Sequence, residues 1–283
     1  MTKVTVPPQP APVFVVAAPR SGGQRLARWL SGPERPVNHW LGVIDAARAG
    51  RGLPLLDKSD MWTREDALAW SPWLQPVLDQ HGPDVAPTVV AFEFAPATLL
   101  RVAALAHWFP KARFVFLYRD VRETLALMLD SWIASRHQHA SGVQLPSAQR
   151  WNFPLPPGWS AQCHRPLIEI VAWQWAKMMR VGMDMLAELD PARWCVTSYD
   201  RLLQDPFGEL RGIAQFLDCL PYPQQSAGRR FLPADRTSPD AVLWLAHADA
   251  LKLAAPIVAL QADRAVQLFA TPPQTRIVAM RGE

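Results

Sequence analysis

The sequence predicts an α/β fold with three layers, in which a central parallel sheet is flanked by helices on both faces. Several short segments are continuously apolar, as in strands that are buried on both sides. Longer helical segments separate them, which indicates that helices connect parallel strands. The chain has 283 residues, of which 49% are hydrophobic, so it can bury a large core. It shows no internal repeat and no clear domain linker, which favours a single domain.

Strands and helices alternate along the whole chain. Residues 1–12 are rich in proline and predict a flexible tail before a domain of residues 13–283. The expected strands are Val13–Ala18, Thr88–Phe92, Arg113–Tyr118 and Trp194–Ser198. The expected helices are Gly22–Leu30, Arg64–Gln80, Ala97–Trp108, Val121–Ile133, Pro166–Leu189, Phe207–Leu217 and Ala241–Phe269. Ligands of such sheets bind beyond the carboxyl ends of the strands, where Arg20, Glu93, Arg119 and Tyr199 all fall.

The first strand leads into a feature typical of anion sites. Residues 13–30 run as an apolar strand, break at Pro19 into a turn of small residues, and continue as a helix. Such a turn points several backbone N–H groups at one spot, and the helix dipole there favours anions. The segment predicts a P-loop-like site for a phosphate or phosphosulfate, with a plain strand–turn–helix connection as the alternative. The Lys-Ser/Thr pair of a nucleoside-triphosphate loop is absent.

A second apolar strand ends at Arg119-Asp120 and runs into an amphipathic helix. Together the two segments resemble the sulfotransferases that use 3′-phosphoadenosine-5′-phosphosulfate (PAPS). In that family the first loop, typically P-[KR]-S-G-T-T, holds the 5′-phosphosulfate. The second, typically R-D-P-R-D, holds the 3′-phosphate. Later stretches resemble motifs of the bacterial branch in the same order, namely residues 93–96 (EFAP), 151–159 (WNFPLPPGW), 193–206 and 238–244.

The resemblance implies transfer of a sulfuryl group from PAPS to a hydroxyl or amine of a small-molecule, lipid, saccharide or peptide acceptor. It implies that Glu93 is the general base; a cap on the helix that follows at Pro96 is the alternative. Arg20 is expected to act in catalysis as well as in binding, because it lies nearer the leaving group. The expected donor-binding residues are Arg20, Ser21, Gly22, Gly23, Gln24, Arg25, Arg119 and Tyr199.

An insert of about residues 134–165 is rich in proline and tryptophan. Its prolines forbid regular structure, whereas its aromatic residues favour burial. A lid over the acceptor pocket, with Trp151, Phe153 and Trp159 in contact with substrate, explains both properties. A surface loop that its tryptophans fasten to the core is the alternative. The His137-Gln138-His139 segment is a weak metal motif and reads as a solvated loop.

Several positions depart from the family pattern. Gly23 and Gln24 replace two hydroxyl residues, Phe94 replaces a lysine, and Leu127 replaces a serine. Each change except Gln24 removes a hydrogen-bond donor. Arg25 can supply the missing positive charge or stack on adenine; the alternative is that it points to solvent. These losses leave open a catalytically degenerate relative that binds a nucleotide or a partner protein.

Composition excludes other classes of protein. The formal charge of +4 and the pI of about 9.2 come from scattered arginines, not from the basic stripe of a nucleic-acid binder. Three distant cysteines argue against a disulfide scaffold or zinc site and for a reducing compartment. No cluster of carboxylates or histidines has metal-ligand spacing, so we expect no metal requirement. No apolar run has membrane-spanning length and the N-terminus lacks a signal-peptide core, so we expect a cytoplasmic protein without stable membrane insertion.

Overall fold

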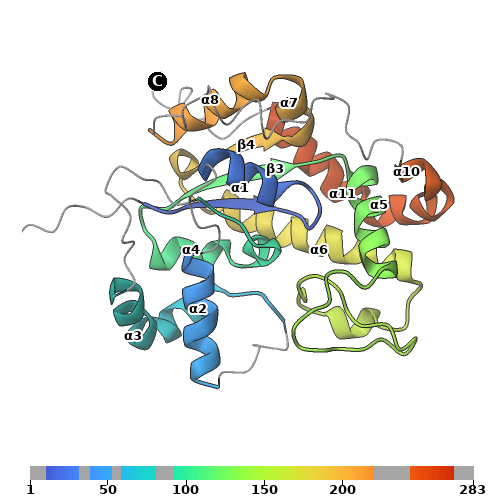
Figure 1. Cartoon of the computed structure of the whole chain (residues 1–283), viewed down its shortest axis with the longest axis horizontal. Coiled ribbons are helices and arrows are strands. Elements are labelled where there is room, and N and C mark those ends of the chain that lie inside the picture. Colours follow the sequence, from blue (N-terminus) through green and yellow to red (C-terminus); the bar gives the residue numbers. More distant parts are fainter. Residues whose placement is uncertain (1–10, 32–38, 53–58, 81–91, 219–242, 271–283) are drawn as a thin grey trace, which may run out of the picture.

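The structure is a computed structural model that describes residues 11–31, 39–52, 59–80, 92–218 and 243–270 (Figure 1). These residues form a parallel sheet of four strands in the order β2-β1-β3-β4. The strands are β1 (Val13–Ala17), β2 (Phe92–Glu93), β3 (Arg113–Tyr118) and β4 (Trp194–Ser198). The predicted α/β fold is confirmed. Because the chain places β2 on one side of β1 and β3 on the other, the topological switch point lies at the carboxyl end of β1.

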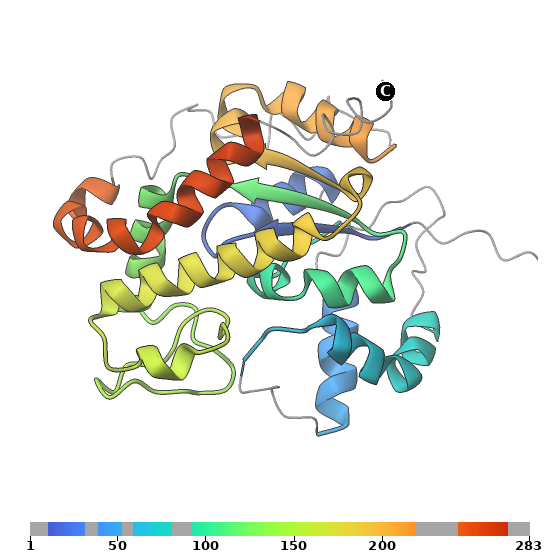
Figure 2. The ribbon, with the colours of Figure 1, turned by 180° about the vertical axis from the view of Figure 1, so that it is seen from behind.

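Side chains of β1 alternate between two hydrophobic cores, as expected for a strand in the middle of a three-layer fold. Val13 and Val15 face a core that includes side chains of α1 (Gly23–Ser31), α7 (Tyr199–Gln204) and α8 (Pro206–Phe216). Phe14 and Val16 face a larger core that includes side chains of α4 (Val102–Trp108), α6 (Leu167–Ala187) and α11 (Ala248–Ala270). Figure 2 shows α6 and α11 side by side over this second face.

Most predicted helices are present with small shifts at their ends. The helices α3 (Arg64–Gln80) and α5 (Val121–Ile133) have the predicted bounds. The helix predicted over 97–108 is divided into the 3-10 helix η2 (Pro96–Leu100) and α4, because Arg101 leaves the helical region with φ −126° and ψ 0°. The helix predicted over 241–269 is divided into α10 (Leu243–Ala246) and α11. Two further 3-10 helices, η3 (Trp159–Gln162) and η4 (Pro191–Arg193), precede α6 and β4.

The helix α2 (His39–Gly50) was not predicted from the sequence. The backbone N–H groups of Trp40 and Leu41, in its first turn, donate hydrogen bonds to the Glu93 carboxylate at 2.5 and 2.9 Å. A capping residue normally lies next to the helix that it caps. Here the acceptor is more than fifty residues away in the chain, so no local pattern announces the start of α2.

The Pro/Trp insert is joined to the rest of the molecule by a polar cluster and by tryptophans in edge-to-face contact. His139 Nε2 lies 2.9 Å from Asp60 Oδ2, and Asp60 also pairs with Arg101 at 3.7 Å. The backbone N–H of Asp60 donates to the Leu155 carbonyl, and the backbone N–H of Leu155 donates to Asp60 Oδ2. Trp151 is fully buried, with ring contacts to tryptophans on both sides at 5.3 and 5.5 Å. These contacts fix the insert against the core.

Some predictions fall outside the described residues. These are the tail of residues 1–12 apart from its last two positions, most of the strand predicted over 88–92, and the motif at 238–244 apart from its end. In the part of the chain that the structure describes, no helix has both the length and the apolar character that a membrane span requires.

Candidate active site

A cavity of about 400 Å³ lies beyond the carboxyl ends of the strands. It has the size of a small ligand pocket. Its walls come from the turn after β1, the segment after β2, the ends of β3 and β4, helix α5 and the insert. The described lining residues are Arg20, Gly22, Gly23, Gln24, Arg25, Phe94, Ala95, Pro96, Arg119, Leu127, His137, Phe153 and Tyr199. They include three arginines and no Asp or Glu, so the cavity favours anions.

The turn between β1 and α1 is built to present its backbone to this cavity. Arg20 adopts φ +65° and Gly22 adopts φ +96°. A Cβ on Gly22 would lie 2.7 Å from the ring of Tyr199, so only glycine fits there. The first N–H groups of α1 have no partner within the helix and are free for an anion. Ser21 differs from the prediction: both its N–H and its hydroxyl bond the Ala18 carbonyl, at 3.2 and 2.5 Å, and its side chain is buried.

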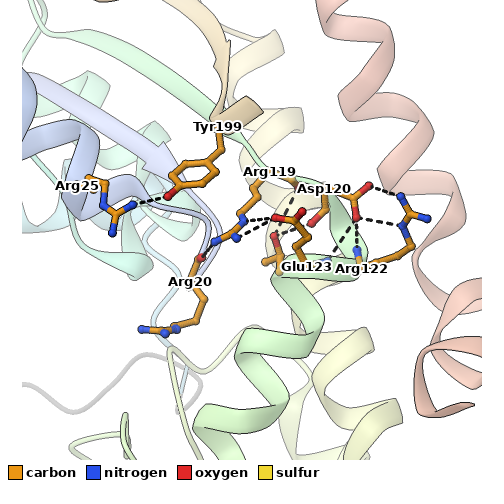
Figure 3. Close-up of polar contacts among 8 residues, drawn as sticks. Arg20, Arg25, Arg119, Asp120, Arg122, Glu123 and Tyr199 are labelled. Carbon is orange, nitrogen blue, oxygen red and sulfur yellow. Dashed lines mark hydrogen bonds and ion pairs between the residues drawn. The ribbon is translucent and has the colours of Figure 1, made fainter. Parts of the chain in front are cut away.

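Arg20 is an exposed cation of the cavity. Its backbone carbonyl accepts a hydrogen bond from Arg119 at 3.4 Å, while its guanidinium points away from that contact (Figure 3). Within the described residues this guanidinium forms no hydrogen bond or ion pair. It is therefore available to a ligand.

Arg119 is buried and held from several sides. Its Nε and Nη2 lie 2.9 and 2.8 Å from Glu123 Oε2, one turn along α5. Its guanidinium also lies 4.5 Å from the centre of the Tyr199 ring. The arginine is thus fixed in orientation, and Glu123 offsets part of its charge (Figure 3).

Arg25 does not simply point to solvent. Although the residue is exposed, its Nη1 donates to the Tyr199 hydroxyl at 2.5 Å and it lines the cavity. Tyr199 is 2% exposed and lies between Arg25 and Arg119. One tyrosine therefore positions two of the three arginines.

Two departures from the family pattern are in contact with each other. A Cβ on Gly23 would lie 2.6 Å from Cδ2 of Phe94, within the space of the aromatic ring. Phe94 is 8% exposed, and its ring packs on the first turn of α1. The missing side chain at position 23 therefore makes room for the ring at position 94.

Glu93 points away from the cavity that Phe94 lines. Its side chain is fully buried, and both carboxylate oxygens accept hydrogen bonds from the first turn of α2. Burial raises the pKa of Glu93 to about 7, although the hydrogen bonds from Leu41 and Trp40 act to lower it. The carboxylate caps α2, not the helix after Pro96. Its role as a base stays a prediction, and among the described residues it does not line the cavity.

The insert contributes one of its three predicted aromatic residues to the cavity. Phe153 lines it with φ +62°, whereas Trp151 and Trp159 pack on each other outside it. Neither Trp151 nor Trp159 is among the described residues that line this cavity, so their contact with substrate stays a prediction. His137, which we expected in a solvated loop, stacks on Phe153 with ring centres 5.1 Å apart. No local pattern in the sequence predicts this pair, because the backbones of His137 and Phe153 meet only across the folded insert.

No cluster of three or more His, Cys, Asp or Glu side chains that could hold a metal ion occurs among the described residues. The charged residues that line the cavity in the described part of the chain are arginines, and one of them, Arg119, pairs with Glu123. The site can therefore hold a multiply charged anion beside an apolar wall of Phe94, Leu127 and Phe153.

Comparison with known proteins identifies the family of the chain. No curated protein matches the chain significantly. The sulfotransferase domain from the curacin biosynthetic pathway is similar in structure, with a TM-score of 0.54 and 17% identity over 92% of this chain and 98% of that domain. The sulfotransferase STF9 from Mycobacterium avium has a TM-score of 0.49 and 15% identity over 91% of this chain and 77% of that one. The model of the sulfotransferase family matches residues 12–223, so the chain belongs to the sulfotransferase family.

Proposed function

We propose that this protein is a PAPS-dependent sulfotransferase that acts on a hydroxyl or amine of a small-molecule, lipid, saccharide or peptide acceptor. The observation that carries the proposal is the convergence of Arg20, Arg25 and Arg119 with the N-terminus of α1 on one cavity, whose described lining contains no carboxylate. A nucleotide with phosphates at both its 3′ and 5′ positions needs two separate cationic regions, and this cavity offers them.

The donor supplies an activated sulfuryl group, and the protein aligns it and neutralises charge on the leaving phosphate. The free guanidinium of Arg20 and the N–H groups of Gly23 and Gln24 suit the 5′ side. The fixed guanidinium of Arg119 suits the 3′-phosphate. Arg25 lies on the first turn of α1, where it adds the positive charge that Phe94 removed when it replaced lysine.

The direct test is calorimetry with adenosine 3′,5′-bisphosphate, the product that PAPS leaves behind. We expect binding by the wild type and weaker binding by Arg20→Ala. Arg28→Ala is the matched control, because Arg28 is an exposed residue of α1 outside the cavity lining. A second measurement follows labelled sulfate from PAPS into an extract of small molecules, where Arg20→Ala should also lose turnover. Binding without transfer to any acceptor would favour a non-catalytic binding protein, and no binding at all would reject the proposal.

A further inference from the structure

The cavity is lined by His137, a residue that has no role in the proposed function as stated. We propose that His137 is the base that accepts the proton of the acceptor hydroxyl, and that the acceptor presents this hydroxyl on an apolar body. This inference rests on the proposed function and adds to it a residue and a substrate class. It starts from the composition of the cavity wall.

Among the described lining residues, only His137 and Tyr199 are neutral groups able to take up a proton. The hydroxyl of Tyr199 is occupied by Arg25 and lies between two arginines. A phenol has an ordinary pKa near 10, whereas an imidazole titrates near neutral pH, where a base is most effective. Glu93 turns both carboxylate oxygens to α2. His137 is therefore the lining residue best suited to remove a proton.

The backbone around His137 is held firmly. The His137 N–H donates to Asn152 Oδ1 at 3.0 Å, and its carbonyl accepts from the Phe153 N–H at 2.8 Å. Gln174, from the core helix α6, donates to the carbonyls of Asn152 and Pro154 at 2.9 and 2.8 Å. These bonds hold Phe153 at its positive φ, and its ring sets the plane of the imidazole by stacking.

Two residues with strained backbone conformations line the same cavity. Of the non-glycine residues with positive φ in the described chain, Arg20 and Phe153 both line this cavity, one from the donor loop and one from the insert. Such conformations persist where surrounding structure enforces them, and they are concentrated at functional sites. The pair brings the Arg20 guanidinium and the stacked imidazole of His137 to the same cavity.

The charges around His137 keep the ring in its basic form. Partial burial, followed by the positive charges of Arg20 and Arg136, lowers the pKa of His137 below its ordinary value of 6.5. No described lining residue is a carboxylate that would oppose this effect. The surroundings of His137 therefore favour the uncharged imidazole, which is the form that accepts a proton.

The step balances without another reactant. The acceptor oxygen forms a bond to the donor sulfur as the bond between sulfur and the 5′-phosphate oxygen breaks. The acceptor proton passes to the free ring nitrogen of His137. The products are the sulfate ester, the nucleotide bisphosphate and an imidazolium, which returns its proton to water after the products leave.

The acceptor class follows from the apolar part of the cavity lining. Phe153, which stacks on His137, lines the cavity together with Leu127, Phe94 and Pro96, and these four residues give it an apolar surface. A saccharide would leave most of its hydroxyls without partners there, which is costly. A hydroxyl on a flat apolar body buries its carbon atoms against Phe153 and directs its oxygen to His137.

The experiment compares two phenols of similar size that differ in acidity. para-Cresol is un-ionised at mildly alkaline pH, whereas para-nitrophenol is largely ionised and needs no base. We expect the wild type to transfer sulfate from PAPS to both. His137→Gln should lower kcat/KM for para-cresol by roughly 10²-fold or more and change it little for para-nitrophenol. His137→Phe, which retains the stack on Phe153, should show the same contrast, and His164→Gln, an exposed histidine of the same insert, should show none.

The outcomes separate this inference from the proposed function. Equal losses with both phenols in His137→Gln would make the residue structural and overturn its role as a base. Transfer to neither phenol by a wild type that binds adenosine 3′,5′-bisphosphate would overturn the inference and leave the proposed function standing. Failure of the wild type to bind that nucleotide would reject both.

Discussion

Replacing Glu93 by glutamine should change how the stability of the protein depends on pH. The pKa of Glu93 is raised from its ordinary 4.5 to about 7 by burial. The folded protein therefore retains a proton that the unfolded chain releases, and stability falls as the pH rises from 4.5 to about 7. The difference in pKa corresponds to about 3 kcal/mol when the transition is complete. Between about pH 5 and about pH 8 the expected loss from this group is about 2–3 kcal/mol.

Glutamine cannot ionise, so the stability of the variant does not fall with rising pH on account of this residue. Its amide oxygen can accept from one N–H group of α2, but its NH₂ group cannot accept from the other. Leaving a buried donor unpaired costs about 1–3 kcal/mol. At about pH 5 the variant should be less stable than the wild type by about that amount, and between about pH 5 and about pH 8 this difference should shift by about 2–3 kcal/mol in favour of the variant.

Urea unfolding of both proteins at the two pH values measures this change. The difference in unfolding free energy between the two proteins is obtained at each pH, and subtracting one of these differences from the other cancels the contributions of all other titrating groups. Glu188→Gln, at the exposed end of α6, is the control and should show the same difference at both pH values. A Glu93→Gln difference that does not change with pH would refute the reasoning, because it would mean that Glu93 titrates alike in the folded and unfolded states.

Four further outcomes follow from the charged residues of the cavity and from the packing of the donor loop. Arg119→Ala should weaken binding of adenosine 3′,5′-bisphosphate by about 1.5–3 kcal/mol in calorimetry, the scale of a charged hydrogen bond, while the melting temperature changes little. Glu123→Gln should tighten the same binding about fivefold, or about 1 kcal/mol, because it removes a negative charge 2.8 Å from Arg119; weaker binding would show that the carboxylate serves mainly to position the arginine. Gly23→Thr should destabilise the protein by about 1–3 kcal/mol in urea unfolding, since its Cβ overlaps the Phe94 ring, and the double variant with Phe94→Ala should recover most of that loss. Arg25→Ala should raise KM for PAPS, and unchanged kinetics would make this arginine a bystander.

Much of the fold could be predicted from the sequence because the strands that build the sheet are short apolar runs. Val13–Ala17 and Arg113–Tyr118 pair in parallel over their length, and each is followed within three residues by an arginine of the cavity. The carboxyl ends of parallel strands meet at one edge, so the convergence of Arg20 and Arg119 required no knowledge of tertiary contacts. Local sequence patterns therefore predict the sheet and the residues that directly follow its strands.

The features that escaped prediction depend on contacts between distant residues. Helix α2 is capped by Glu93 from β2, so neither segment carries a local signal of the other. Glu93 follows a strand as a catalytic residue would, but the direction of its side chain is decided by the N–H groups of that helix. His137 reaches the cavity only because Asn152 and Phe153 bind its backbone across the insert. The positions of Glu93 and His137 along the chain therefore could not show which of the two lines the cavity.

The departures at the donor loop have a different meaning in the structure than in the sequence. In the sequence, Gly23 and Phe94 are two separate losses of a phosphate-binding group. In the structure they are complementary, because the ring at 94 occupies the volume that any side chain at 23 would need. Random loss in an inactive protein has no reason to produce a matched pair, and the neighbouring Arg25 supplies positive charge to the same cavity. Restoring threonine at position 23 therefore requires removal of Phe94 first, and the order in which the two substitutions are tolerated distinguishes a repacked working site from one that has decayed.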